Sequence, residues 1–200
     1  MRGRQISYFS SLRLLKILPR SGWVSRGISL SDVESVAEHS FSTSALAMFL
    51  ADMEVARGRR LNVERVLRLA LIHDLAEALT FDISKSYLEY LGQRGERIKR
   101  EVEKAAWDHI LKSIGDSSIR SAYSRLLAEF NAGESTESQI VHGADKLDIL
   151  FQIVSYRQKG YPRAMLADLW TNTHRALSRS KLASVRELRR KATELYRAVH

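Results

Sequence analysis

The chain has 200 residues, of which 44% are apolar and 28% charged, the composition of a soluble globular protein with one domain. It contains no cysteine, which excludes disulfides and thiolate metal ligands, and no apolar run long enough to span a bilayer. Only ten glycines and two prolines interrupt it, so we expect an all-α fold. The formal net charge of +9 favours an anionic partner, although a solvated basic surface explains it equally well.

The first candidate binding residues follow a predicted N-terminal helix. This amphipathic helix covers residues 6–18 and ends at Pro19. The loop after it carries Arg20 and Trp23. An arginine can bind a phosphate through two parallel hydrogen bonds, and a tryptophan can lie against a sugar or a base. The alternative is that Trp23 pins the loop to the core.

Residues 35–57 are predicted to form the next helix. Ser35 and Glu38 have the spacing of a capping box at its start. His39 follows in the first turns and shares one helical stripe with Thr43, Leu46 and Leu50. His39 therefore points inward, either as a core histidine or as part of a site.

A histidine and two acids follow the most apolar helical stretch of the chain. Asn62 is the predicted cap of this helix, and residues 66–72 carry almost no polarity apart from Arg68. At about 100° per residue, His73, Asp74 and Glu77 share one side of a continuous helix. Burying an imidazole beside two carboxylates is costly unless something pairs with them. A divalent cation would pair with them, which indicates a metal site. The alternative is that His73 and Asp74 are a surface pair or that His73 is a hydrogen-bonded core histidine.

The second half of the chain is predicted to be helical, with no repeat and no linker that divides it. The expected helices cover residues 87–91, 96–114, 117–130, 138–151, 162–177 and 182–199. In the helix over residues 138–151, Asp145 stands beside the apolar stripe, where an apolar residue would ordinarily pack. Asp145 is therefore predicted to be a further acid in the core.

Together, these positions give two imidazoles and two carboxylates on three helices: His39, His73, Asp74 and Asp145. Such a set leaves coordination positions open for water and a substrate oxygen, as a catalytic metal site requires. Mixed nitrogen and oxygen ligands suit Mn, Fe, Co, Ni or Zn. No other histidine repeats the His-Asp pair, so we expect one metal ion.

The ordered His, His-Asp and Asp pattern in a helical chain resembles the HD-domain superfamily of metal-dependent phosphohydrolases. Segments 18–24, 34–40, 69–77, 82–83 and 144–146 resemble its 5′-deoxynucleotidase branch, which removes phosphate from deoxynucleoside 5′-monophosphates. The likeness covers roughly residues 10–160. It implies a single HD domain over residues 1–200, with helices 161–200 packed on a core of about 10–160.

By this resemblance, His39, His73, Asp74 and Asp145 hold one divalent metal ion, which is Mn, Co, Ni, Zn, Fe or Mg. Glu77 would orient or deprotonate the attacking water. Arg20 would grip the phosphate, and Trp23 would select against a 2′-hydroxyl. The sugar side would be lined by Asp82, Ile83, Ser84 and Lys85.

Two departures from the branch pattern concern the substrate side. Ser21 and Gly22 separate Arg20 from Trp23, whereas the family often has the tryptophan directly after the arginine. Phe81 stands where the family usually has glycine.

The resemblance also implies a homodimer that acts on a small nucleotide. We expect no membrane partner, because no apolar run could span a bilayer. We expect no nucleic-acid partner, because a basic binder would have no reason to keep His39, Asp74 and Asp145 inward. Residues 1–20 show no uninterrupted apolar stretch of the secretory kind, so we expect a cytoplasmic protein.

Three alternatives stay open for the function. One is an HD-type enzyme acting on nucleoside triphosphates or guanosine tetraphosphate, one a basic helical nucleic-acid-binding protein, and one a regulatory protein that has lost turnover.

Overall fold

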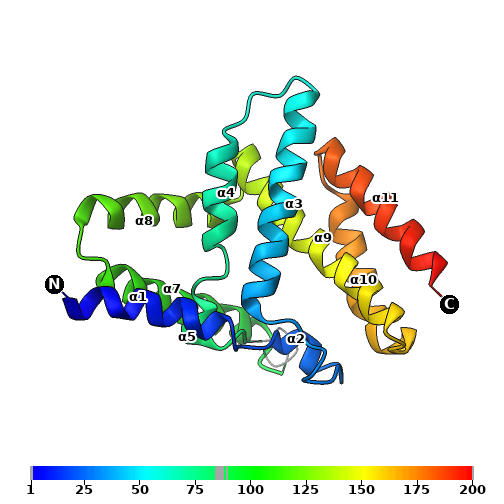
Figure 1. Cartoon of the computed structure of the whole chain (residues 1–200), viewed down its shortest axis with the longest axis horizontal. Coiled ribbons are helices and arrows are strands. Elements are labelled where there is room, and N and C mark those ends of the chain that lie inside the picture. The colour runs from blue at the N-terminus through cyan, green and yellow to red at the C-terminus, as the bar shows by residue number, and fades with distance from the viewer. Residues whose placement is uncertain (1, 84–87, 89, 200) are drawn as a thin grey trace. The chain divides into compact units, whose positions relative to one another are not determined.

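The computed structural model of the chain describes residues 2–83, 88 and 90–199. Within these residues the fold is helical and contains no strand, which confirms the all-α prediction (Figure 1). An isolated β-bridge joins Pro19 to Ser35. None of the described helices combines the length and the apolarity that crossing a bilayer requires.

The chain divides into two compact units. The first comprises Met1–Ser40 and Leu71–Ala128, and the second Phe41–Ala70 and Glu129–His200. The chain passes from one unit to the other inside three helices, α3 (Val36–Ala56), α4 (Val63–Ile72) and α8 (Ser117–Ala132). The single domain over residues 1–200 stays a prediction.

The first unit carries most of the predicted site residues. Its other helices are α1 (Arg2–Leu15), α2 (Ser21–Val24), α5 (Glu77–Thr80) and α7 (Gln93–Ser113). Helices α1, α5 and α7 pack against one another. Their core includes Leu15, Leu75, Ala78, Trp107 and Ile110, all of them buried. This core fixes α5, and with it the turn that follows α4.

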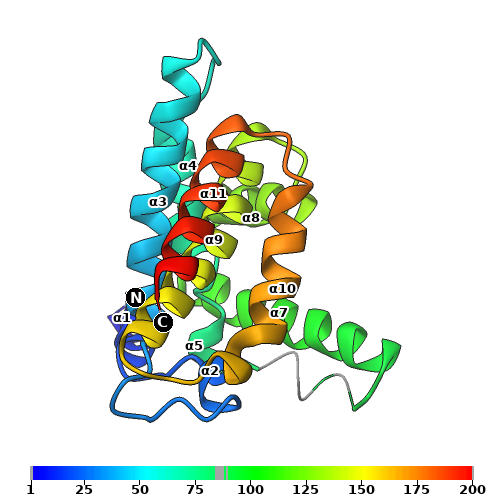
Figure 2. The same ribbon diagram turned by 90° about the vertical axis from the view of Figure 1, so that its right-hand side faces the viewer.

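The second unit is built on α9 (Thr136–Gln158), which is buried along much of its length. Helices α10 (Arg163–Ser178) and α11 (Ala183–Ala198) pack on it and on each other (Figures 1 and 2). Gly143 explains the close contact between α9 and α11. A Cβ at this position would lie 2.7 Å from Cγ2 of the buried Val185, so only glycine fits without a shift.

Two predicted helix caps are confirmed by their hydrogen bonds. The backbone N–H of Ser35 donates to the Glu38 carboxylate (2.6 Å), and the backbone N–H of Glu38 donates to Ser35 Oγ (3.2 Å). This is the reciprocal pattern of a capping box. Asn62 Oδ1 accepts from the backbone N–H of Arg65 (2.9 Å) at the start of α4. Both caps depend on neighbours in sequence, which is why local pattern predicted them.

The predicted continuous helix through His73, Asp74 and Glu77 is wrong in one respect. Helix α4 ends at Ile72, residues 73–76 form a turn, and α5 begins at Glu77. The backbone N–H of Leu75 donates to the carbonyl of Ile72, and that of Glu77 to the carbonyl of Asp74. These bonds reach back three residues instead of four, as in a tighter 3₁₀ turn. The side-chain directions therefore come from this turn and not from one helical face.

Candidate metal centre

Three of the predicted ligands converge in the first unit. His39 comes from the start of α3, and His73 and Asp74 come from the turn after α4. The two Nε2 atoms of His39 and His73 lie 3.4 Å apart. Asp74 Oδ2 lies 3.4 Å from Nε2 of His39 and 3.3 Å from Nε2 of His73. Three potential ligand atoms thus form a nearly equilateral triangle.

The triangle has the size that a transition-metal ion requires. With metal–nitrogen and metal–oxygen bonds of about 2.1 Å, ligand atoms around a tetrahedral ion lie about 3.4 Å apart. His39 is fully buried and His73 is 8% exposed, so water does not solvate these rings freely. Two imidazole nitrogens and a carboxylate oxygen are the donor set of many mononuclear sites. The residues present therefore fit a divalent metal ion.

Arg20 lies at the edge of this triangle, among three carboxylates. Its Nη1 is 3.0 Å from Asp74 Oδ2, 3.1 Å from Glu77 Oε2 and 3.6 Å from Asp82 Oδ1. The Arg20 side chain is only 15% exposed, so these interactions are weakly screened by solvent. A fixed guanidinium next to a metal-sized site is suited to holding a phosphate oxygen.

The two acids beside Arg20 differ in acidity. Burial raises the pKa of Asp74, but the His73 imidazole, hydrogen bonds from both histidines and Arg20 outweigh it and hold that pKa well below its usual range. Burial and the negative charge of Asp74 raise the pKa of Glu77 well above its usual range, against the opposing effect of Arg20. Asp74 is thus suited to bind a cation as an anion, and Glu77 to accept a proton.

The segment around Arg20 is held by backbone bonds to the residues at the start of α3. The backbone N–H of Arg20 donates to the carbonyl of Glu34 (3.0 Å), and that of Val36 to the carbonyl of Leu18 (2.9 Å). Trp23 is 3% exposed, and its indole N–H donates to Glu34 Oε1 (2.7 Å). Trp23 therefore pins the loop to the core of the first unit, as the alternative interpretation of this residue from the sequence has it. Its selection against a 2′-hydroxyl stays a prediction.

The turn after α5 has an unusual backbone. Phe81 and Asp82 have positive φ angles of 59° and 45°, in the left-handed region that favours glycine. The glycine expected here from the resemblance would adopt this conformation freely, whereas Phe81 adopts it under strain. The Asp82 carboxylate accepts the backbone N–H of Ser21 (2.6 Å), and the Ser21 hydroxyl donates to the Asp82 carbonyl.

The remaining predicted site residues lie outside the cluster formed by His39, His73, Asp74 and Arg20, or outside the described residues. Ile83 is half-buried after the turn, and Ser84 and Lys85 lie outside the described residues. Asp145 is half-buried on α9, in the second unit, and its role as a ligand stays a prediction.

Two residues at the site were missed as functional candidates from the sequence. Glu34 brings a carboxylate oxygen within 4.8 Å of a ring nitrogen of His39 and also accepts from Trp23. Ser21 contacts Asp82 across 61 positions of sequence. An acid just before a capped helix gives a weak local signal for Glu34, whereas no local pattern points to Ser21.

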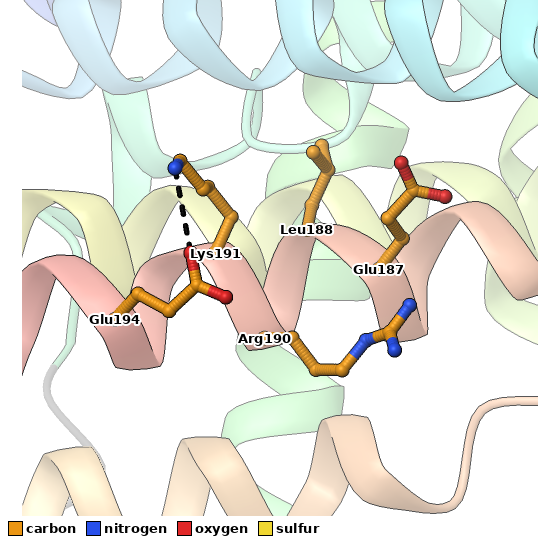
Figure 3. A pocket seen from close by; sticks show the side chains of 5 residues that line it. All are labelled: Glu187, Leu188, Arg190, Lys191 and Glu194. Carbon is orange, nitrogen blue, oxygen red and sulfur yellow. Dashed lines mark hydrogen bonds and ion pairs between the residues drawn. The ribbon is translucent and has the colours of Figure 1, made fainter.

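A surface depression of about 360 Å³ lies elsewhere, on α11 (Figure 3). It is lined by Glu187, Leu188, Arg190, Lys191 and Glu194. Lys191 Nζ lies 3.4 Å from a Glu194 carboxylate oxygen, the ordinary ion pair of an exposed helix face. The depression contains none of the predicted site residues.

The helical fold and a His/Asp cluster that fits a metal ion indicate a class of protein, helical with a candidate metal site. Comparison with known proteins names the family. A profile described as HD domain matches residues 12–185. The chain belongs to the HD domain family. This confirms the resemblance seen in the sequence.

Individual proteins are similar to this chain in sequence or in structure. The 5′-deoxynucleotidase HDDC2 of Danio rerio is 31% identical over 159 residues, covering 80% of this chain and 72% of its own. The PH0347 protein from Pyrococcus horikoshii OT3 is 29% identical, with a TM-score of 0.80 over 95% of this chain and 99% of its own. An HD-domain phosphohydrolase from Listeria innocua has the same fold, with a TM-score of 0.79 at 24% identity over 96% of this chain and 89% of its own.

Proposed function

We propose that the protein is a metal-dependent 5′-deoxynucleotidase, which hydrolyses (deoxy)nucleoside 5′-monophosphates to nucleoside and phosphate. The observation that carries the proposal is the triangle of His39, His73 and Asp74 with the Arg20 guanidinium beside it. Several relatives are named 5′-deoxynucleotidase, which supports this substrate class.

One divalent ion is proposed to be held by His39, His73 and Asp74, with Asp145 as a further predicted ligand. When bound, such an ion neutralises charge on a phosphate oxygen and lowers the pKa of its water toward neutrality. Any of Mn, Co, Ni, Zn, Fe and Mg is compatible with a mixed nitrogen and oxygen site.

The chain's own residues supply the remaining steps. Arg20 binds phosphoryl oxygens and keeps the phosphorus atom in place. Glu77, whose pKa is raised, accepts the proton of the water that attacks the phosphorus. The bond between phosphorus and the 5′ oxygen breaks, and that oxygen takes up a proton as the nucleoside leaves. On the sugar side we keep Trp23, Asp82, Ile83, Ser84 and Lys85 as predicted contacts.

The test of the activity is phosphate release from a substrate panel. The panel comprises deoxy- and ribonucleoside 5′-monophosphates, deoxynucleoside triphosphates and guanosine tetraphosphate. We expect release from the deoxynucleoside monophosphates, and at most slow release from the polyphosphates. Faster turnover of a polyphosphate would favour the other HD-type phosphohydrolase instead.

We also propose that the protein acts as a homodimer in the cytoplasm. Helix α3 exposes a set of large apolar side chains, Phe41, Met48, Phe49 and Val55, which a second copy would cover. Sedimentation of the wild type and of Phe41→Ser/Phe49→Ser tests the dimer. A monomeric wild type would contradict it.

A further inference from the structure

We infer that Ser21 is a positioning residue, which forms with Asp82 a latch that fixes the guanidinium of Arg20. The name latch is used here for the two hydrogen bonds between Ser21 and Asp82. The inference rests on the proposed function only where it is read out through turnover.

The first bond of the latch caps a helix that has no cap of its own. Ser21 is the first residue of α2, and a backbone N–H at this position has no acceptor within its helix. Arg20, at the N-cap, makes no side-chain capping bond. The Asp82 carboxylate accepts this N–H instead, at 2.6 Å. An acid from a distant turn thus satisfies the donor next to Arg20.

The second bond joins the two backbones. The Ser21 hydroxyl donates to the carbonyl of Asp82 itself. Asp82 is 9% exposed and has a φ of 45°, and both its carboxylate and its carbonyl accept hydrogen bonds from Ser21. This bond ties the loop that carries Arg20 to the turn directly after α5, the helix that begins at Glu77.

Arg20 is thereby held on both sides. Its own N–H donates to the Glu34 carbonyl, and the next N–H in the chain donates to Asp82. The same Asp82 carboxylate lies 3.6 Å from Arg20 Nη1 through its other oxygen. With the backbone and the guanidinium both tied to Asp82, the guanidinium stays beside Asp74 and Glu77. Loss of the latch would let the arginine move without altering its chemistry.

This positioning role makes a kinetic prediction that a merely structural role does not. Ser21→Ala removes the hydroxyl bond and should raise KM for a deoxynucleoside monophosphate about three- to tenfold, the effect of one hydrogen bond, with kcat little changed. Ser21→Thr retains the hydroxyl and should restore KM. Ser25→Ala is the matched control, because Ser25 Oγ also donates to a carbonyl of α2, that of Gly22, within the same loop segment.

A double-mutant cycle tests whether Ser21 acts through Arg20. In an Arg20→Ala background, Ser21→Ala should change kcat/KM by less than about twofold, because the positioned group is gone. An equal loss in both backgrounds, or a KM that Ser21→Ala leaves unchanged, would overturn the inference.

Hydrogen exchange of the residue 21 amide tests the latch without turnover. Asp82→Ala should speed this exchange at least tenfold, at a temperature where the variant is folded, while the Trp23 amide stays protected by the Arg20 carbonyl. Unchanged exchange at residue 21 would overturn the latch. Fast exchange in the variant, with no phosphate release from wild type, would sustain the latch and refute the proposed function.

Discussion

At the scale of single residues, the site holds one arginine among three carboxylates, all of them mostly buried. The negative charges exceed what Arg20 balances, and the two acids nearest to it respond in opposite directions. Asp74 stays an anion because donors surround it, whereas Glu77 takes up a proton more readily. This difference in acidity favours Asp74 as a ligand of a divalent cation and Glu77 as a positioned base.

Replacing Glu77 by glutamine tests the assignment of the base. Glu77→Gln should lower kcat by about 10²- to 10⁴-fold, the usual contribution of a general base, because the amide cannot accept the proton of water. Metal content, measured by elemental analysis, should stay that of wild type. The control is Glu64→Gln, on an exposed acid of α4. Normal turnover in Glu77→Gln would remove Glu77 from the mechanism.

The backbone of Phe81 makes a prediction about stability. Its side chain is 66% exposed, so the phenyl ring contributes little through burial, and its φ of 59° strains the backbone. Phe81→Gly should stabilise the fold by about 0.5–1 kcal/mol, since relief of strain exceeds the entropy that glycine adds to the unfolded chain. Urea unfolding measures this. Phe81→Ala keeps the strain and should show no such gain; equal effects of the two variants would contradict the argument.

Residues whose pattern is local could be predicted from the sequence, and residues joined across the chain could not. His39, His73 and Asp74 were found because polar residues interrupt apolar helical stretches. Ser21 carries no such signal, because its partner Asp82 is 61 positions away and only the folded chain brings them together. The role of Trp23 is ambiguous from the sequence for a similar reason, since the partner of its indole N–H, Glu34, belongs to a later segment.

At the scale of elements, helix existence was predictable and one helix end was not. The stretch around His73 has helical composition throughout, yet the backbone tightens after Ile72. An α-helical and a 3₁₀ turn accept the same residues, so packing against other elements decides between them.

Helix α11 offers an element-scale prediction with a defined pH dependence. Its N-cap residue makes no side-chain bond; Glu54 of α3, 1% exposed, accepts the backbone N–H of Ser184 (2.8 Å) and pairs with Arg59 Nε (2.7 Å). Burial raises the pKa of Glu54, but these partners outweigh it and leave the pKa below its usual value. Glu54→Gln should therefore cost about 1–3 kcal/mol of the unfolding free energy at pH 7.

The sign of the pH effect follows from the lowered pKa. The carboxylate contributes its stability above the unfolded pKa of about 4.3 and loses it as the pH falls through the lower pKa of the folded state. Urea unfolding of the wild type and of Glu54→Gln should thus give a difference in unfolding free energy that shrinks on acidification below about pH 4. Asp52→Asn, on an exposed acid of α3, is the control. A difference that does not vary with pH would contradict the capping role.

At the scale of the whole molecule, charge and composition bound the class of protein but do not locate its site. The net charge of +9 is uneven, because six basic residues precede the first acid, Asp32. The candidate site, by contrast, is a local excess of acids around Arg20. Of the four predicted ligands, three meet within the first unit, and Asp145 belongs to the second. The apolar stripe of its helix indicated that Asp145 is an acid in the core, whereas its role as a metal ligand came from the order of motifs along the chain.

The most direct test of the central claim is phosphate release by chelated protein to which single metals are added back. The wild type should release phosphate from a deoxynucleoside monophosphate only after Mn, Co, Ni, Zn, Fe or Mg is restored. Asp74→Ala should bind less metal and show no release, whereas Asp108→Ala, on an exposed acid of α7, should behave as wild type. Release that persists in Asp74→Ala, or a wild type that binds no metal, would contradict the account.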